Sequence, residues 1–193
     1  MLTDLPNLLT LSRIAAIPLL VVIVAVGTPV AHLLATLLFI AAGITDWLDG
    51  HLARTRRQQS EIGRMMDPIA DKLLVGATLM LLAGLGRFPD GALYAAIVIL
   101  LREMLVSGLR EFLGGIQISL PVTQLAKWKT GFQMGALGTL LAGDDVAALL
   151  HVPLPVALIG ELMLWTAAVL TLVTGWGYLR ASLRHAQGAP GQV

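Results

Sequence analysis

The chain has 193 residues, of which 56% are hydrophobic and only 13% are charged, and its formal net charge is +1. A soluble domain of this size would carry more charge, so the composition predicts an integral membrane protein. Because the sequence contains no cysteine, disulfide bridges and thiolate chemistry are excluded. We expect no nucleic-acid partner for a chain of this kind.

Six apolar runs reach the length of about 20 residues that a membrane-spanning helix requires. They cover residues 7–26, 30–51, 65–85, 91–113, 120–142 and 155–179. Turn-forming or charged segments separate them at residues 27–29, 54–61, 86–91, 114–119 and 143–155. The prediction is therefore an all-α integral membrane protein with six transmembrane helices, which form a single domain over residues 1–193. We expect the loop residues Asp90, Asp144 and Asp145 to be solvated.

The placement of lysine and arginine predicts the orientation, because cytoplasmic loops are enriched in these residues. If the N-terminus is cytoplasmic, nearly all basic residues gather on that face, and Arg87 falls clearly on the other. No basic residue precedes the first apolar run, so we expect no cleaved signal peptide. Both termini are therefore predicted to face the cytoplasm.

Four aspartates border the second and third apolar runs. Asp46 and Asp49 are three residues apart, and Asp67 and Asp71 are four apart, so each pair shares one face of a predicted helix. A carboxylate without a partner beside apolar surface is costly, so a converging set requires a cation. Oxygen-only ligation, with no cysteine and no nearby histidine cluster, favours Mg²⁺ or Mn²⁺.

Small residues lie between the two aspartate pairs. Gly50, Ala53 and Gly63 let a ligand or another helix approach the backbone closely. The segment reads DxxDGxxAR, with Arg54 closing this element, then eight residues, then GxxxDxxxD, and it fills all eight fixed positions of that pattern. This segment resembles the signature of the CDP-alcohol phosphotransferase family.

The resemblance implies a role for each aspartate. Asp46, Asp49 and Asp67 match metal ligands of the family, and Asp71 matches a residue that contacts the second of two divalent ions and serves as general base. Two such ions would clamp the pyrophosphate of a CDP-linked donor. Because a carboxylate has an ordinary pKa of about 4, it becomes an efficient base only where its surroundings raise that value. Asp71 lies deepest of the four in its predicted helix.

The same resemblance implies where the nucleotide binds. In the family, the small residues leave room for the cytidine of the CDP donor. The implied CDP-binding set in this chain is Asp46, Asp49, Gly50, Ala53, Arg54 and Gly63. Members of the family are known as homodimers, so a homodimer is expected here.

Basic residues in the fourth and fifth apolar runs indicate an anionic second substrate. A cation close to lipid needs a partner, and guanidinium groups suit a phosphate dianion. The candidate phosphate-binding residues are Arg102, Arg110, Lys127 and Lys129. Lys127 and Lys129 are two apart and cannot share one helix face. Arg102 has an alternative partner in Glu103 or Glu111, so pairing within the protein stays open.

Three blocks carry a more specific resemblance. PNLLTLSR at residues 6–13, REMLVSGLRE at 102–111 and KWKTGFQM at 127–134 are similar to the branch of the family whose acceptor is sn-glycerol 3-phosphate. This resemblance extends from residue 6 to residue 134, and the sixth run matches only in being apolar. It implies transfer of a phosphatidyl group from CDP-diacylglycerol to sn-glycerol 3-phosphate, with release of CMP. It also implies a bacterial inner (cell) membrane location, with the active site facing the cytoplasm and in contact with membrane lipids.

Two alternatives remain open at this stage. The acceptor alcohol could be inositol phosphate, serine or phosphatidylglycerol. In an ion-coupled transporter, by contrast, intramembrane carboxylates carry a cation. Against a transporter, no inverted repeat is evident, and Asp46 and Asp49 lie at the end of a predicted helix rather than at its middle.

Overall fold

The computed structural model describes residues 5–56, 61–89, 91–115 and 123–186, and within these ranges every regular element is an α-helix. Side chains are described for fewer residues, because those of 5–7, 47–56, 61–64, 181 and 184–186 lie outside the described set. The helices are α1 (Leu5–Ala25), α2 (Pro29–Arg56), α3 (Glu61–Gly84), α4 (Ala92–Gly115), α5 (Gln124–Leu149) and α6 (Val156–Ala186). Each helix overlaps one of the predicted apolar runs, so the predicted all-α fold class is confirmed.

Four of these helices contain a stretch that is long and apolar enough to cross a membrane, by length and composition. The stretches are Leu8–Ala25, Pro29–Asp46, Ala92–Gly115 and Val156–Arg180. Within the described residues, α3 and α5 do not meet the same criterion. Both carry charges inside the helix, for example Asp67 and Asp71 in α3 and Lys127 and Lys129 in α5. Four candidate spans are therefore established, and six spans stay a prediction.

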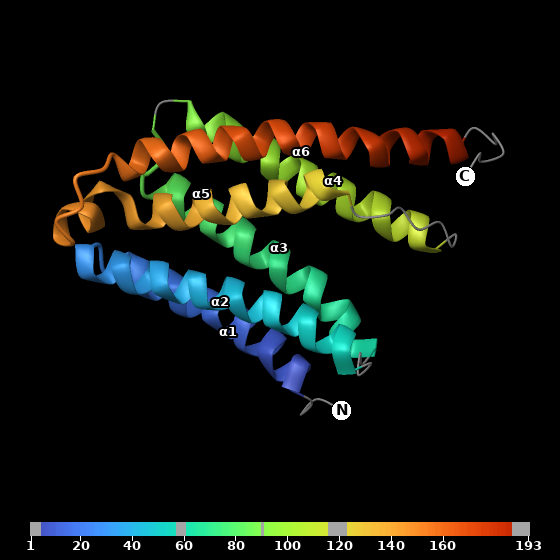
Figure 1. Cartoon of the computed structure of the whole chain (residues 1–193), viewed down its shortest axis with the longest axis horizontal. Helices are drawn as coiled ribbons and strands as arrows, with labels where there is room; N and C mark the ends of the chain where they lie inside the picture. The colour runs from blue at the N-terminus through green and yellow to red at the C-terminus, as the bar shows by residue number, and fades with distance from the viewer. Residues whose placement is uncertain (1–4, 57–60, 90, 116–122, 187–193) are drawn as a thin grey trace.

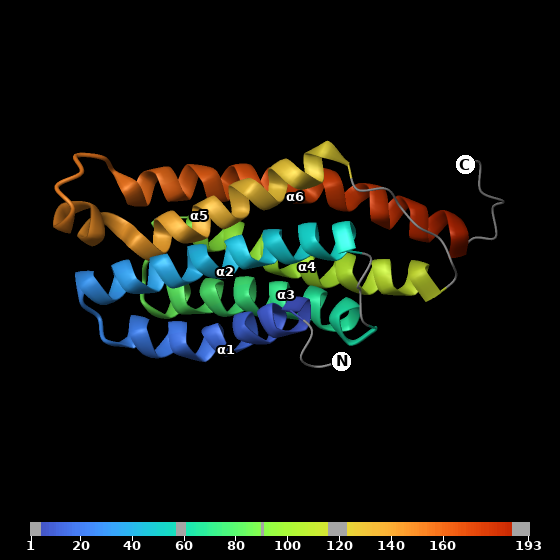
Figure 2. The same cartoon turned by 60° about the horizontal axis from the view of Figure 1, so that its bottom comes forward.

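The helices form two groups that diverge along the length of the molecule. Figure 1 shows α4, α5 and α6 on one side and α1 and α2 on the other, with α3 running between them. The principal packed pairs are α5 with α6, α1 with α2, α4 with α6, α2 with α5 and α1 with α3. The turn between α1 and α2 and the turn between α5 and α6 lie at the same end of the molecule (Figure 1), which we call the narrow end. We call the opposite end the wide end. The start of α1 and the end of α6 both lie at the wide end (Figures 1 and 2).

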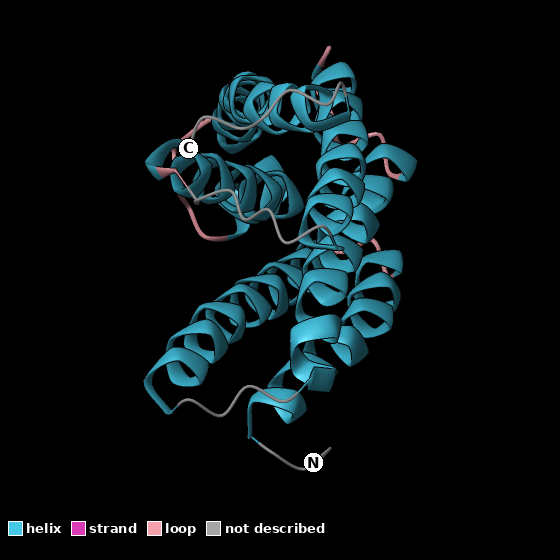
Figure 3. Ribbon diagram, turned by 90° about the vertical axis from the view of Figure 1, so that its right-hand side faces the viewer, coloured by secondary structure: helices cyan, strands magenta, loops and turns pink. Residues whose placement is uncertain are grey.

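The view onto the wide end in Figure 3 shows the separation between the α1–α2 group and α4 with α6. The core that joins the groups is apolar, and its largest fully buried residues include Leu20, Phe39, Leu74, Leu82, Ile99, Leu137 and Leu164. Large apolar side chains also cover the outside, where Val22, Leu101 and Leu172 are exposed. An apolar exterior of this extent fits contact with lipid rather than with water.

Small residues allow α5 and α6 to approach closely. A Cβ atom at Gly160 would lie 2.8 Å from both Cγ of Leu140 and Oγ1 of Thr139. At Gly135 a Cβ atom would collide with the side chain of Met163. Helices in membranes commonly use such small residues at their contacts, because close backbone approach increases van der Waals attraction.

A cluster of polar side chains connects three segments of the chain at the narrow end. Gly143 has φ +64° and ψ −177° and divides α5 into two helical segments. Arg87 donates from Nη1 to the carbonyl oxygen of Leu141 at 2.6 Å, which satisfies a backbone group close to the kink. Oδ2 of Asp145 lies 2.6 Å from both Nη2 of Arg87 and Nδ1 of His32. The cluster therefore joins α2, α5 and the turn that precedes α4.

This cluster corrects two expectations from the sequence. The predicted loop at residues 143–155 begins too early, because α5 continues through Asp144 and Asp145 to Leu149. Asp145 is paired rather than simply solvated, whereas Asp90 lies outside the described residues. Partial burial by itself would raise the pKa of Asp145, but its hydrogen bond with His32 and the charge of Arg87 outweigh that effect and lower the pKa. Asp145 therefore stays ionised at neutral pH.

We predict different effects on stability for two glycine-to-alanine substitutions in α6. Gly160→Ala should lower the free energy of unfolding by about 1–3 kcal/mol, because the new methyl group overpacks the α5–α6 contact. Gly177→Ala is the matched control, since a Cβ atom there would meet nothing within 4 Å. The control should be neutral or stabilising by up to about 1 kcal/mol. Thermal unfolding of the purified protein in detergent measures both, and a Gly160→Ala protein as stable as the control would contradict the packing.

Candidate functional site

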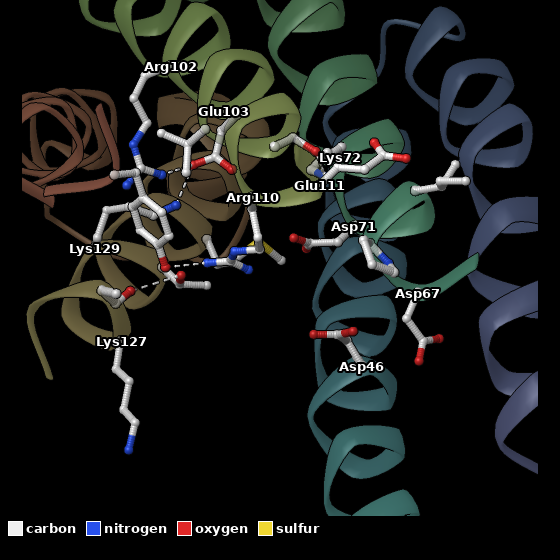
Figure 4. A pocket seen from close by; sticks show the side chains of 18 of the residues that line it. Asp46, Asp67, Asp71, Lys72, Arg102, Glu103, Arg110, Glu111, Lys127 and Lys129 are labelled. Atoms are coloured by element: carbon white, nitrogen blue, oxygen red, sulfur yellow. Dashed lines mark hydrogen bonds and ion pairs between the residues drawn. The ribbon is translucent and has the colours of Figure 1, made fainter. Parts of the chain in front are cut away.

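A cavity of about 1100 Å³ opens between the helices toward the wide end. It is lined by residues of α2, α3, α4, α5 and α6 (Figure 4). Its charged lining residues are Asp46, Asp67, Asp71, Lys72, Arg102, Glu103, Arg110, Glu111, Lys127 and Lys129. Seven residues predicted from the sequence for metal or phosphate binding are in this set. The chain thus brings the second, third, fourth and fifth predicted helices together around one space.

Three carboxylates form the acidic wall of the cavity, which we define as Asp46 of α2 with Asp67 and Asp71 of α3. Helix α1 supports two of them. Nη1 of Arg13 lies 2.5 Å from Oδ1 of Asp46, and Oγ1 of Thr10 donates to Oδ1 of Asp67 at 2.5 Å. Both α1 side chains are buried, and because they are three residues apart they share one helix face.

The third carboxylate of the acidic wall differs from the other two. Asp71 has no hydrogen bond or ion pair within the described part of the chain, although it is only partly exposed. Figure 4 shows its carboxylate directed into the cavity, toward Arg110. Asp71 is therefore the acidic-wall carboxylate that no described side chain engages.

The opposite side of the cavity is the basic wall, which consists of Arg102 and Arg110 of α4 with Lys127 and Lys129 of α5. Lys129 donates to Oε1 of Glu103, and Nη1 of Arg102 donates to the same oxygen at 3.2 Å. Lys129 is buried, whereas Lys127 is exposed and points away from Glu103 (Figure 4). The expectation that the two lysines do not share one helix face is confirmed, and of the partners left open for Arg102 the structure shows Glu103.

Helix α6 supports the basic wall from behind. Nη2 of Arg102 donates to Oγ1 of Thr174 at 2.7 Å. Nη2 of Arg110 donates to the hydroxyl of Tyr178 at 2.8 Å, and its guanidinium carbon lies 5.2 Å from the centroid of that ring. The second contact is a cation–π interaction, which favours a charged guanidinium at this position.

Several residues of the site were not predicted from the sequence. Thr10 and Arg13 belong to the PNLLTLSR block, so the block marked the segment without indicating their contacts. Lys72, which follows Asp71 directly, donates to Ser107 and so links α3 to α4 at the cavity. For Tyr178 the sequence offered no signal, because it lies beyond the blocks that carried the resemblance.

For five predicted residues, the structure gives the helix but not the side chain. Asp49, Gly50, Ala53 and Arg54 lie in α2 and Gly63 in α3, and their side chains are outside the described set. Among the side chains that are described, no three aspartates, glutamates or histidines approach closely enough to hold a metal ion. The acidic-wall carboxylates are the oxygen ligands that the cavity offers to a divalent cation.

Comparison with known proteins identifies the family. The family model described as CDP-alcohol phosphatidyltransferase matches residues 3–173. This chain belongs to that family. The family generally uses divalent metal ions, which agrees with an acidic wall of carboxylate oxygens. The match continues past residue 134 and into α6, further than the resemblance of individual sequence blocks indicated.

Bacterial relatives match over nearly their whole length. A protein of Rickettsia bellii is 43% identical over 182 residues, which cover 94% of this chain and 97% of the relative. A protein of Bacillus subtilis is 37% identical over 187 residues, covering 91% of this chain and 93% of the relative. Both are named CDP-diacylglycerol–glycerol-3-phosphate 3-phosphatidyltransferase, as is a relative from Cereibacter sphaeroides that is 37% identical.

Proposed function

We propose that the protein transfers the phosphatidyl group of CDP-diacylglycerol to sn-glycerol 3-phosphate, which gives phosphatidylglycerophosphate and CMP. The observation that carries this proposal is the opposition of the acidic and basic walls across one cavity. Such a cavity suits two phosphorylated substrates, one bound through cations and the other through arginine and lysine side chains. The names and coverage of the bacterial relatives support the same reaction.

In this proposal Asp46, Asp49, Asp67 and Asp71 hold two divalent ions, Mg²⁺ or Mn²⁺. In support, the described carboxylates offer only oxygen donors, the ligands that such ions prefer, and the contact of Arg13 with Asp46 marks a position that attracts positive charge. When bound, the ions would neutralise the pyrophosphate of the donor and make its phosphorus more electrophilic. The backbone at Gly50, Ala53 and Gly63, together with Arg54, would accept the cytidine end of the donor.

The protein supplies the base and the orientation for the reaction. Asp71 would accept the proton of the acceptor's primary hydroxyl as that oxygen attacks the phosphorus next to diacylglycerol. The bond from this phosphorus to the oxygen of CMP breaks as the new ester bond forms, and CMP leaves. The basic wall of Arg102, Arg110, Lys127 and Lys129 would supply the positive charge that attracts the acceptor's phosphate, and so orient the acceptor's hydroxyl toward Asp71.

The membrane arrangement follows from the same distribution of charge. We infer that all six helices span a bacterial inner membrane, with the wide end and both termini at the cytoplasmic face. The basic wall lies toward the wide end and Arg87 at the narrow end, as the enrichment of basic residues in cytoplasmic regions predicts. The cavity would then open to soluble glycerol 3-phosphate and to the inner leaflet. A homodimer is expected from the family.

The direct test is an assay of CMP release. Purified protein with CDP-diacylglycerol should release CMP only when both a divalent ion and sn-glycerol 3-phosphate are present, and the lipid product should be phosphatidylglycerophosphate. Serine, inositol phosphate and phosphatidylglycerol serve as competing acceptors in parallel reactions. Faster CMP release with any of these than with glycerol 3-phosphate would assign a different acceptor.

A substitution at the proposed base tests the mechanism separately. Asp71→Asn should lower kcat by about 10²–10⁴-fold, the usual contribution of a positioned general base, and leave the protein folded. Asp144→Asn is the matched control, because Asp144 accepts a hydrogen bond from the backbone of Ala157 at the other end of the molecule and asparagine can do the same. Unchanged turnover in Asp71→Asn would rule out its role as base.

A further inference from the structure

The four residues of the basic wall differ in what compensates their charge. Lys129 and Arg102 both donate to Oε1 of Glu103. The side chains of Lys129, Arg102 and Glu103 are 9%, 11% and 16% exposed. A carboxylate and its two partners are therefore largely withdrawn from solvent. Ion pairs in such a buried position are screened little, so removal of one member strongly changes the electrostatic surroundings of the others.

Helix α6 fixes Arg102 further. Its Nη2 donates to Thr174, while its Nη1 donates to Glu103. A Cβ atom at Gly175 would lie 3.0 Å from Nε of Arg102, so this nitrogen lies against the α6 backbone. The guanidinium is thus held between α4 and α6, and the Arg102 side chain is only 11% exposed.

Arg110 and Lys127 have no such partner. Within the described residues no carboxylate lies in ion-pair distance of either side chain, and both are exposed at the cavity. The contact of Arg110 with Tyr178 orients the guanidinium without neutralising it. These two residues are therefore the members of the basic wall without a carboxylate partner in the part of the chain that the structure describes, whereas Lys129 and Arg102 share one carboxylate and together with it keep a net charge of +1.

On the basis of the proposed function, we propose that Glu103 is a positioning residue that holds Lys129 and Arg102 as its counterions, and that Arg110 and Lys127 bind the acceptor's phosphate. Lys129 then affects the phosphate through Glu103, by neutralising a carboxylate that would otherwise repel the dianion. The basic wall is thus divided into a part in which two cations share one carboxylate, held by α4, α5 and α6, and an anion-binding part formed by Arg110 and Lys127.

A double-mutant cycle tests this division. Lys129→Met should raise KM for glycerol 3-phosphate about tenfold, because Glu103 then keeps only Arg102 as a partner and the net charge of the group falls from +1 to zero. Adding Glu103→Gln to the same chain should return KM to within about threefold of the wild-type value. Arg110→Met should raise KM by at least as much, and Glu103→Gln should not reverse that defect. KM for CDP-diacylglycerol should change less than about twofold in every variant.

The outcomes are distinguishable. If Lys129→Met with Glu103→Gln is as impaired as Lys129→Met alone, Lys129 binds the phosphate directly and the inference is overturned, while the proposed function stands. A wild-type protein without glycerol-3-phosphate-dependent CMP release overturns both. If a variant is too unstable to assay, the same cycle is read from melting temperatures, where Glu103→Gln should again offset the loss caused by Lys129→Met. Additive losses of stability would contradict the pairing.

Discussion

A carboxylate beside an apolar helix bundle has to be neutralised, and this constraint organises the wide end of the protein. The chain meets it by pairing within the protein at Asp46 with Arg13 and at Glu103 with Lys129. Asp71 has no such partner among the described residues. The paired carboxylates are thereby held in position at the cavity, and Asp71 adds a carboxylate that no described side chain engages.

The helix packing keeps this polar cavity compatible with an apolar core. Packing of α2 against α5, and the cluster around Arg87 at the narrow end, hold the two groups of helices together. Toward the wide end the groups diverge, and charged side chains from α2, α3, α4 and α5 line the space between them. A transferase that joins a lipid-linked donor to a soluble acceptor requires an opening of this kind, reached from the bilayer and from water.

Local sequence patterns predicted the helices and the aspartates, because apolar run length and residue spacing are properties of short segments. They did not predict which charges pair, since Arg13 meets Asp46 and Lys129 meets Glu103 only after distant helices pack. The continuation of α5 past Gly143 was missed for the same reason: Arg87, far away in sequence, satisfies the backbone at the kink. The support of Arg110 by Tyr178 likewise depends on α6 lying against α4.

We propose that the acidic wall binds divalent ions opposite a basic wall that binds phosphate. Anomalous diffraction from crystals grown with Mn²⁺ and CDP tests it most directly. Manganese is expected at about 2.0–2.2 Å, close to the Mg²⁺–oxygen distance, from carboxylate oxygens of Asp46, Asp67 and Asp71. Manganese bound elsewhere, with Arg13 and Thr10 as the only partners of the acidic wall, would contradict it.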